Sequence, residues 1–123
     1  IVCIENDPAI LDGMKTLLSS WDARVIAVAE PEAAIEAIEA AGGCITGLLV
    51  DYHLNRGNGI ATIREIRRKF GETIPAILIT ADRSPHVREA AQLEQVSVLN
   101  KPLKPASLRA LIGQWRNQQI AAE

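Results

Sequence analysis

Short runs of aliphatic and β-branched residues alternate along the chain with longer segments in which apolar residues recur at helical spacing. Most of the short runs are apolar throughout rather than at every second residue, which is typical of strands buried on both faces of a parallel sheet. The pattern predicts strands at residues 1–4, 24–29, 46–50, 76–80 and 97–99. Because each run is followed by a helical segment, we expect an α/β fold with a doubly wound, five-stranded parallel sheet and helices on both faces.

The helical segments carry apolar stripes that would face the sheet, at residues 10–21, 33–41, 60–70, 86–92 and 108–115. Prolines directly follow Asp7, Glu30, Ser84 and Lys104. Proline favours the first turn of a helix, so four of the helices are expected to begin at these prolines. Asp7 and Ser84 are suitable N-caps. The fourth segment has the thinnest apolar face, and we expect it to be the most mobile helix.

Composition limits the classes of function. The 123 residues suffice for one compact domain, 1–123, and the missing initiator methionine suggests a piece of a longer chain. Thirteen basic and fifteen acidic residues give a net charge of -2, which does not favour nucleic acid or an anionic membrane as a partner. No apolar run approaches the ~20 residues that span a bilayer, so we expect a cytoplasmic location. Cys3 and Cys44 lack metal-ligand spacing and are expected to be free thiols.

Polar side chains gather where the predicted strands end. They are Glu5, Asn6, Asp7, Asp51, Thr80 and Lys101. In a doubly wound sheet these ends meet at one edge, where ligands bind. Each residue has a simpler explanation, such as a helix cap for Asp7, a turn for Asp51 or a surface position for Lys101. Carboxylates from separate strands repel one another unless a hard cation such as Mg²⁺ neutralises them, so the set as a whole predicts a metal site.

Four short motifs surround these residues. They are Ile-Val-Cys-Ile-Glu-Asn-Asp-Pro at 1–8, Leu-Leu-Val-Asp-Tyr-His-Leu at 48–54 with Gly57 and Gly59, Ile-Leu-Ile-Thr-Ala at 77–81, and Leu-Asn-Lys-Pro at 99–102. In this order and at this spacing they resemble the receiver domain of two-component response regulators, over essentially the whole chain. The resemblance implies the flavodoxin-like (βα)5 fold with strand order 2-1-3-4-5. Residues 98–109 look more like the C-terminal receivers of hybrid sensor histidine kinases than like receivers joined to DNA-binding domains.

The resemblance implies that Asp51 is a phosphoacceptor. Its donor would be a phosphohistidine on a histidine kinase or a histidine phosphotransfer domain, and the chemistry would be nucleophilic catalysis by a carboxylate. Lys101 would offset charge on the transferring group, and Thr80 would hydrogen-bond to it. On this interpretation the domain catalyses only its own phosphorylation and dephosphorylation.

Mg²⁺ is the cofactor that the resemblance implies. Its ligands would be Glu5, Asn6, Asp51 and the backbone carbonyl of His53. Most receivers carry two acidic residues at the first two of these positions, whereas here the second is an amide. Asn6 contributes an oxygen without charge, so we expect weaker Mg²⁺ binding, unless Glu5 reaches the ion directly.

Further residues are expected to modulate the site. Ala81 is small and would leave a path to the acceptor, Asp82 lies at a position that often tunes the lifetime of the phosphoryl group in the family, and the peptide bond before Pro102 is cis in family members. The family's usual switch aromatic in the fifth strand is replaced by Val98. Any conformational signal would therefore travel through the loop after Thr80 and the fourth helix.

Two other functions stay open. An unphosphorylated interaction module with the same fold is favoured by Asn6 and Val98. A phosphohydrolase of the haloacid dehalogenase kind is a remote alternative, because those enzymes carry a second acid two residues after the nucleophile, where this chain has His53. A flavin- or nucleotide-binding module is disfavoured because no glycine-rich phosphate loop follows the first strand.

A basic run lies on the third helical segment, at Arg64, Arg67, Arg68 and Lys69. We interpret it as a solvated helix face.

Overall fold

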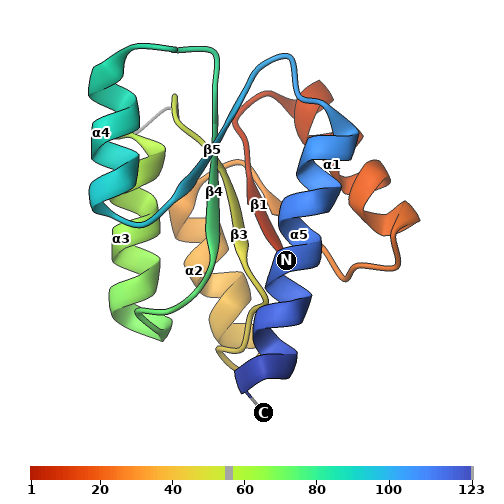
Figure 1. Cartoon of the computed structure of the whole chain (residues 1–123). Coiled ribbons are helices and arrows are strands. Elements are labelled where there is room, and N and C mark those ends of the chain that lie inside the picture. The colour runs from red at the N-terminus through yellow and green to blue at the C-terminus, as the bar shows by residue number, and fades with distance from the viewer. Residues whose placement is uncertain (55–56, 123) are drawn as a thin grey trace.

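The computed structural model describes residues 1–54 and 57–122, with side chains as far as 115 (Figure 1). Five strands alternate with five helices in the described residues. The strands are β1 (Val2–Ile4), β2 (Ile26–Val28), β3 (Leu48–Asp51), β4 (Ala76–Thr80) and β5 (Ser97–Asn100). The helices are α1 (Pro8–Ser20), α2 (Pro31–Ala40), α3 (Gly59–Phe70), α4 (Pro85–Leu93) and α5 (Pro105–Ala122).

All strand pairs in the sheet are parallel, and the order is β2-β1-β3-β4-β5. The predicted flavodoxin-like topology is therefore confirmed. Helices α1 and α5 cover one face, and α2, α3 and α4 cover the other (Figure 1). The strand order reverses between β1 and β3, because β2 lies on one side of β1 whereas β3, β4 and β5 follow on the other side. The carboxyl edge at β1 and β3 is therefore the switch point where this fold binds ligands.

An aliphatic core fills both sides of the sheet, because successive side chains of a strand point to opposite faces. Val2 and Ile4 pack with α2, α3 and α4, while Cys3 between them packs with α1 and α5. Trp115 is buried on the α5 side. Cys3 is buried, Cys44 is exposed and both are free thiols, as predicted.

Proline begins four of the helices, as the sequence predicts. The cap predicted at Asp7 is also confirmed, since its Oδ1 accepts the backbone N–H groups of Ala9 and Ile10 at 3.0 and 3.4 Å. Ser84 also occupies the N-cap position of α4, as predicted, but its side chain makes no capping hydrogen bond. Instead, the Asp82 carboxylate accepts the backbone N–H of Ser84 at 2.9 Å.

The basic run on α3 does not form a uniformly solvated face. Arg67 is buried, and its guanidinium donates to the backbone carbonyls of Ile74, Glu94 and Gln95. The prediction is therefore wrong for Arg67, because tertiary packing brings three backbone carbonyls within reach of its guanidinium. No helix within 1–54 and 57–122 is both long and apolar enough to cross a membrane.

Candidate functional site at the carboxyl edge of the sheet

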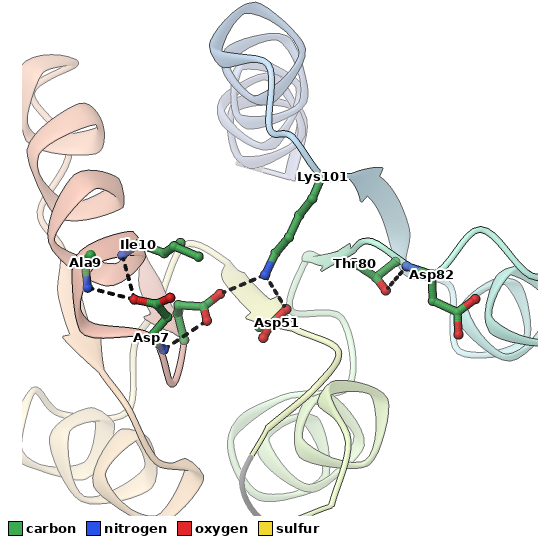
Figure 2. Close-up of polar contacts among 8 residues, drawn as sticks. Asp7, Ala9, Ile10, Asp51, Thr80, Asp82 and Lys101 are labelled. Carbon is green, nitrogen blue, oxygen red and sulfur yellow. Dashed lines mark hydrogen bonds and ion pairs between the residues drawn. The ribbon is translucent and has the colours of Figure 1, made fainter.

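Parallel pairing brings four of the predicted residues to one edge of the sheet. Asp51 is the last residue of β3 and is paired with Ile79, and Thr80 ends β4. Lys101 directly follows β5, and its backbone N–H donates to the Thr80 carbonyl at 2.9 Å. Glu5 directly follows β1. Figure 2 shows the Lys101 side chain extending across this edge toward Asp51.

Lys101 connects the two carboxylates of the edge. Its Nζ lies 3.2 Å from Asp51 Oδ1 and 3.6 Å from Glu5 Oε2. The side chains of Asp51 and Glu5 are only 4% and 5% exposed, so the charges are shielded little by solvent. Two buried carboxylates and one ammonium leave a net charge of -1, which favours a further cation.

Glu5 is held in place by its own chain. Its Oε1 accepts the backbone N–H of Asp7 at 3.1 Å. Burial raises the pKa of Glu5 above its ordinary value, and the negative charge of Asp51 adds to this. The Asp7 N–H and the Lys101 ammonium oppose the rise because they stabilise the carboxylate form.

Asp51 differs from the other buried polar groups. Among the described residues, its Oδ1 is the one buried side-chain oxygen or nitrogen atom without a hydrogen-bond partner. The Lys101 Nζ is close enough for an ion pair, but the geometry is not that of a hydrogen bond. Buried polar atoms are normally satisfied, so an unsatisfied carboxylate oxygen indicates a group kept for chemistry or for a ligand.

The oxygen donors at this edge fit Mg²⁺. An unsatisfied buried oxygen of Asp51 lies beside a second buried carboxylate, and Asn6 follows Glu5 directly. His53, whose carbonyl is the predicted further ligand, lies two residues after Asp51 and forms an antiparallel bridge with Asn58. Among the described residues, no three acidic, histidine or cysteine side chains form a metal-binding group. The buried carboxylates of this edge are those of Glu5 and Asp51.

Thr80 begins a chain of hydrogen bonds that leads to α4. The Thr80 side chain is fully buried, and its Oγ1 accepts the backbone N–H of Asp82 at 2.9 Å. Figure 2 shows the Asp82 side chain directed away from Asp51. The pKa of Asp82 is lowered because the backbone N–H and the hydroxyl of Ser84 stabilise its carboxylate. Ala81, which lies between Thr80 and Asp82 in the chain, is exposed.

Two other predicted positions are also described. The peptide bond between Lys101 and Pro102 is cis, as the resemblance implies. Val98 is half-buried and packs against the core on the α2, α3 and α4 side.

A cavity that the sequence does not reveal adjoins the acceptor. Its volume is about 250 Å³, and its walls combine the polar groups of Asp51, Glu5 and Lys101 with apolar side chains that include Ile10 and Met14. The helical stripe assigned these two residues to core packing alone. Ile10 is 41% exposed, which shows that the buried part of the stripe begins only after the first turn of α1. A larger cavity, of about 410 Å³, lies at the opposite end of the sheet, beside Trp21 and Arg109, and contains none of the predicted site residues.

The family model and the similar proteins indicate the same family. The family model for the response regulator receiver domain matches residues 1–113. The two-component response regulator-like protein APRR1 of Arabidopsis thaliana is 31% identical over 123 residues, which cover 98% of this chain and 20% of that protein. ARR21 of the same plant is 25% identical over 108 residues, which cover 88% of this chain and 17% of that protein. The chain therefore spans about a fifth of the length of these relatives.

The fold has close structural neighbours. The crystal structure of a CheY-like response regulator receiver domain protein from Methanospirillum hungatei superposes with a TM-score of 0.87 at 20% identity. The match covers 99% of this chain and 96% of that one.

Proposed function

The chain belongs to the response regulator receiver domain family of two-component signalling, and we propose that it accepts a phosphoryl group on Asp51. The donor would be a phosphohistidine on a histidine kinase or a histidine phosphotransfer domain. The observation that carries the proposal is the buried Asp51 carboxylate, whose Oδ1 makes no hydrogen bond and lies 3.2 Å from the Lys101 ammonium. Such an oxygen is oriented by the protein and available to an electrophile.

In the proposed step a carboxylate oxygen of Asp51 bonds to phosphorus while the bond from phosphorus to the donor imidazole nitrogen breaks. The electron pair of the broken bond returns to the imidazole, and an aspartyl phosphate results. The Lys101 ammonium offsets negative charge on the transferring oxygens. The Thr80 hydroxyl already accepts a hydrogen bond from Asp82 and keeps its own proton for donation to a phosphoryl oxygen.

Mg²⁺ would be held by Glu5, Asn6, Asp51 and the His53 carbonyl. When bound, the cation supplies positive charge that offsets the charge of the phosphoryl group. Two carboxylates and an amide give this site less negative charge than three carboxylates would, so weaker Mg²⁺ binding is expected than in an all-acid site.

Intact-mass spectrometry after incubation with acetyl phosphate tests the proposal. We expect one phosphoryl adduct that is lost in Asp51→Ala and when a chelator removes Mg²⁺. Asp12→Asn is the matched control, because Asp12 is an exposed acid on α1 outside the site and its loss should leave labelling unchanged. An adduct that persists in Asp51→Ala would contradict the proposed acceptor.

A second candidate is an unphosphorylated interaction module with the receiver fold. The amide at Asn6 and the absence of a three-residue acidic cluster in the described part of the chain favour it. Asn6→Asp separates the candidates. Recovered labelling in that variant would attribute a silent wild type to the missing carboxylate, whereas no labelling in either folded protein would favour the interaction module. The assignment to a hybrid sensor histidine kinase stays a prediction.

A further inference from the structure

We propose that Gly59 is a positioning residue for phosphoryl transfer, because the lack of a side chain lets the first residue of α3 lie directly against the backbone of Asp51. The proposal rests on the proposed function of Asp51. The sequence singles out Gly59 only as part of the acceptor-loop motif.

The contact is too close for any other residue. A Cβ atom at Gly59 would lie 2.4 Å from the Asp51 carbonyl oxygen, 3.0 Å from its carbonyl carbon and 2.9 Å from Leu78 Cδ1. Favourable contacts between carbon atoms lie at about 3.5–4.0 Å. A side chain such as Leu78 can rotate aside, but the carbonyl of Asp51 belongs to the acceptor strand and moves only with it. A methyl group at this position must therefore displace either the end of β3 or the start of α3.

The requirement at Gly59 is for space and not for backbone conformation. Gly57, in the same loop, has a φ of 70°, in the left-handed region that favours glycine, whereas Gly59 does not have a positive φ. The Gly59 backbone N–H also donates to the Tyr52 carbonyl at 2.9 Å. One hydrogen bond and one close contact thus fix α3 against two consecutive residues of the acceptor segment.

The contacts between α3 and the acceptor segment extend to His53, whose carbonyl is a proposed ligand of the site. His53 and Asn58 form an antiparallel bridge, and the Asn58 side chain caps α3 by accepting the Ala61 backbone N–H at 2.9 Å. Both ends of the acceptor loop are therefore joined to the first turn of α3. A displacement at Gly59 moves the Asp51 carboxylate relative to Glu5 and Lys101, which come from other strands, and moves the His53 carbonyl with it.

Gly59→Ala is compared with Gly13→Ala, a matched control. Gly13 is exposed on α1, and a Cβ there would meet nothing within 4 Å. We expect Gly13→Ala to label with acetyl phosphate at the wild-type rate. Gly59→Ala should remain folded by circular dichroism and label at least about tenfold more slowly, because misplacement of a reacting group by an ångström can cost about a hundredfold in rate. Labelling of folded Gly59→Ala within threefold of wild type would overturn the proposal.

Two further variants separate positioning from packing and from folding. Leu78→Val removes the side-chain contact but not the contact with the Asp51 carbonyl. If Gly59 served only packing against Leu78, the Leu78→Val/Gly59→Ala protein would label like Leu78→Val alone, which would overturn the proposal. Alanine at Gly13 favours the α1 helix, so Gly13→Ala/Gly59→Ala is the folded background if Gly59→Ala is unstable. If this double variant is also unfolded, Gly59 is needed for folding and the positioning role is wrong.

A measurement independent of labelling distinguishes failure of this proposal from failure of the proposed function. In ¹⁵N NMR spectra, Gly59→Ala should shift the amide signals of Asp51, Tyr52 and His53 more than those of β1 and β5. Unshifted acceptor-loop signals would overturn the positioning role whether or not the wild type takes up phosphoryl groups. A wild type that does not label, with a shifted loop in the variant, would contradict the function of Asp51 and leave the positioning of its loop supported.

Discussion

Arg67 joins three separate backbone segments, and its removal should destabilise the fold measurably. Nε donates to the Ile74 carbonyl at 2.9 Å, Nη2 donates to the Gln95 carbonyl at 3.1 Å, and Nη1 donates to the Glu94 carbonyl. The side chain thereby ties α3 to the segment just before β4 and to the turn between α4 and β5. Arg67→Met keeps most of the apolar stem and removes every one of these donors.

The expected loss can be worked from the bonds. A hydrogen bond from a charged donor contributes about 1.5–3 kcal/mol net, so the three hydrogen bonds of Arg67 together would contribute more than about 4 kcal/mol if each were simply added. Glu94 and Gln95 are partly or fully exposed, so water can replace the guanidinium at their carbonyls. We therefore expect Arg67→Met to lower the free energy of unfolding by about 3 kcal/mol, a large part of the ~5–15 kcal/mol typical of a domain.

Arg64→Met is the matched control, since Arg64 lies nearly one turn away on the same helix. It also binds near the end of α4, through Nε and Nη2 to Glu94 Oε1 at 3.0 and 2.7 Å, but its side chain is 60% exposed. An exposed ion pair contributes at most about 1 kcal/mol. Urea unfolding, monitored by circular dichroism, gives the free energy of unfolding of each variant by linear extrapolation, provided that the m-values agree. If Arg67→Met lost no more stability than Arg64→Met, the reasoning about the three carbonyls would be refuted.

Three further predictions follow from the caps, the thiols and one carboxylate. Asp7→Ala should lower the free energy of unfolding by about 1 kcal/mol and Ser84→Ala by much less, since of these two side chains Asp7 alone makes a capping hydrogen bond. Equal urea midpoints for the two variants would contradict this. A thiol reagent at about pH 8 should titrate Cys44 alone in the native protein and both cysteines in urea, because burial raises the pKa of Cys3 to about 12 and excludes the reagent. The pKa of Asp82 is lowered by its hydrogen bonds, so its stabilisation is present above the ordinary pKa of about 3.9 and is lost as the pH falls through the lowered value. The difference in Tm between the wild type and Asp82→Ala should accordingly shrink as the pH falls below about 4, and a constant difference would argue against this role.

The sheet was predictable because its signals are local. Strand β4 has the predicted bounds, and prolines mark the starts of four helices. The bounds of β2 and β3 were less predictable. Strand β2 is Ile26–Val28 rather than residues 24–29, and β3 begins at Leu48 rather than at Thr46 and continues to Asp51. Pairing with Ile79 extends β3 to Asp51, and a partner strand is not visible in a local apolar pattern.

The position of Arg67 could have been predicted from helical spacing. Arg67 lies four residues after Ile63 and three before Phe70, so it falls on the buried stripe of α3, whereas Arg64 and Arg68 do not. Its charge favoured the interpretation of the whole basic run as solvated. What the spacing does not provide is the identity of the carbonyls that make its burial possible, since Glu94 and Gln95 lie more than 25 residues away in the chain.

Much of the candidate site was predictable from the rule that parallel strands end at one edge. That rule places Glu5, Asp51, Thr80 and Lys101 together, and the structure describes them there. It does not predict how Lys101 lies between the two carboxylates. Nor does it predict the use of Asp7, whose carboxylate caps α1 while its backbone N–H holds Glu5.

Hydrogen-bond partners divide the buried polar residues of the described chain into two kinds. Arg67 is satisfied by backbone carbonyls, and Thr62 donates to the Asn58 carbonyl, so each has a structural reason to be buried. Thr80 and Glu5 each accept one backbone N–H. Asp51 alone retains a buried oxygen without a hydrogen bond. Asp51 is ion-paired with Lys101, yet one buried oxygen of its carboxylate makes no hydrogen bond. Leaving a buried polar atom unsatisfied is costly, so this oxygen at the switch point of the sheet supports the proposal that Asp51 accepts a group from outside the domain.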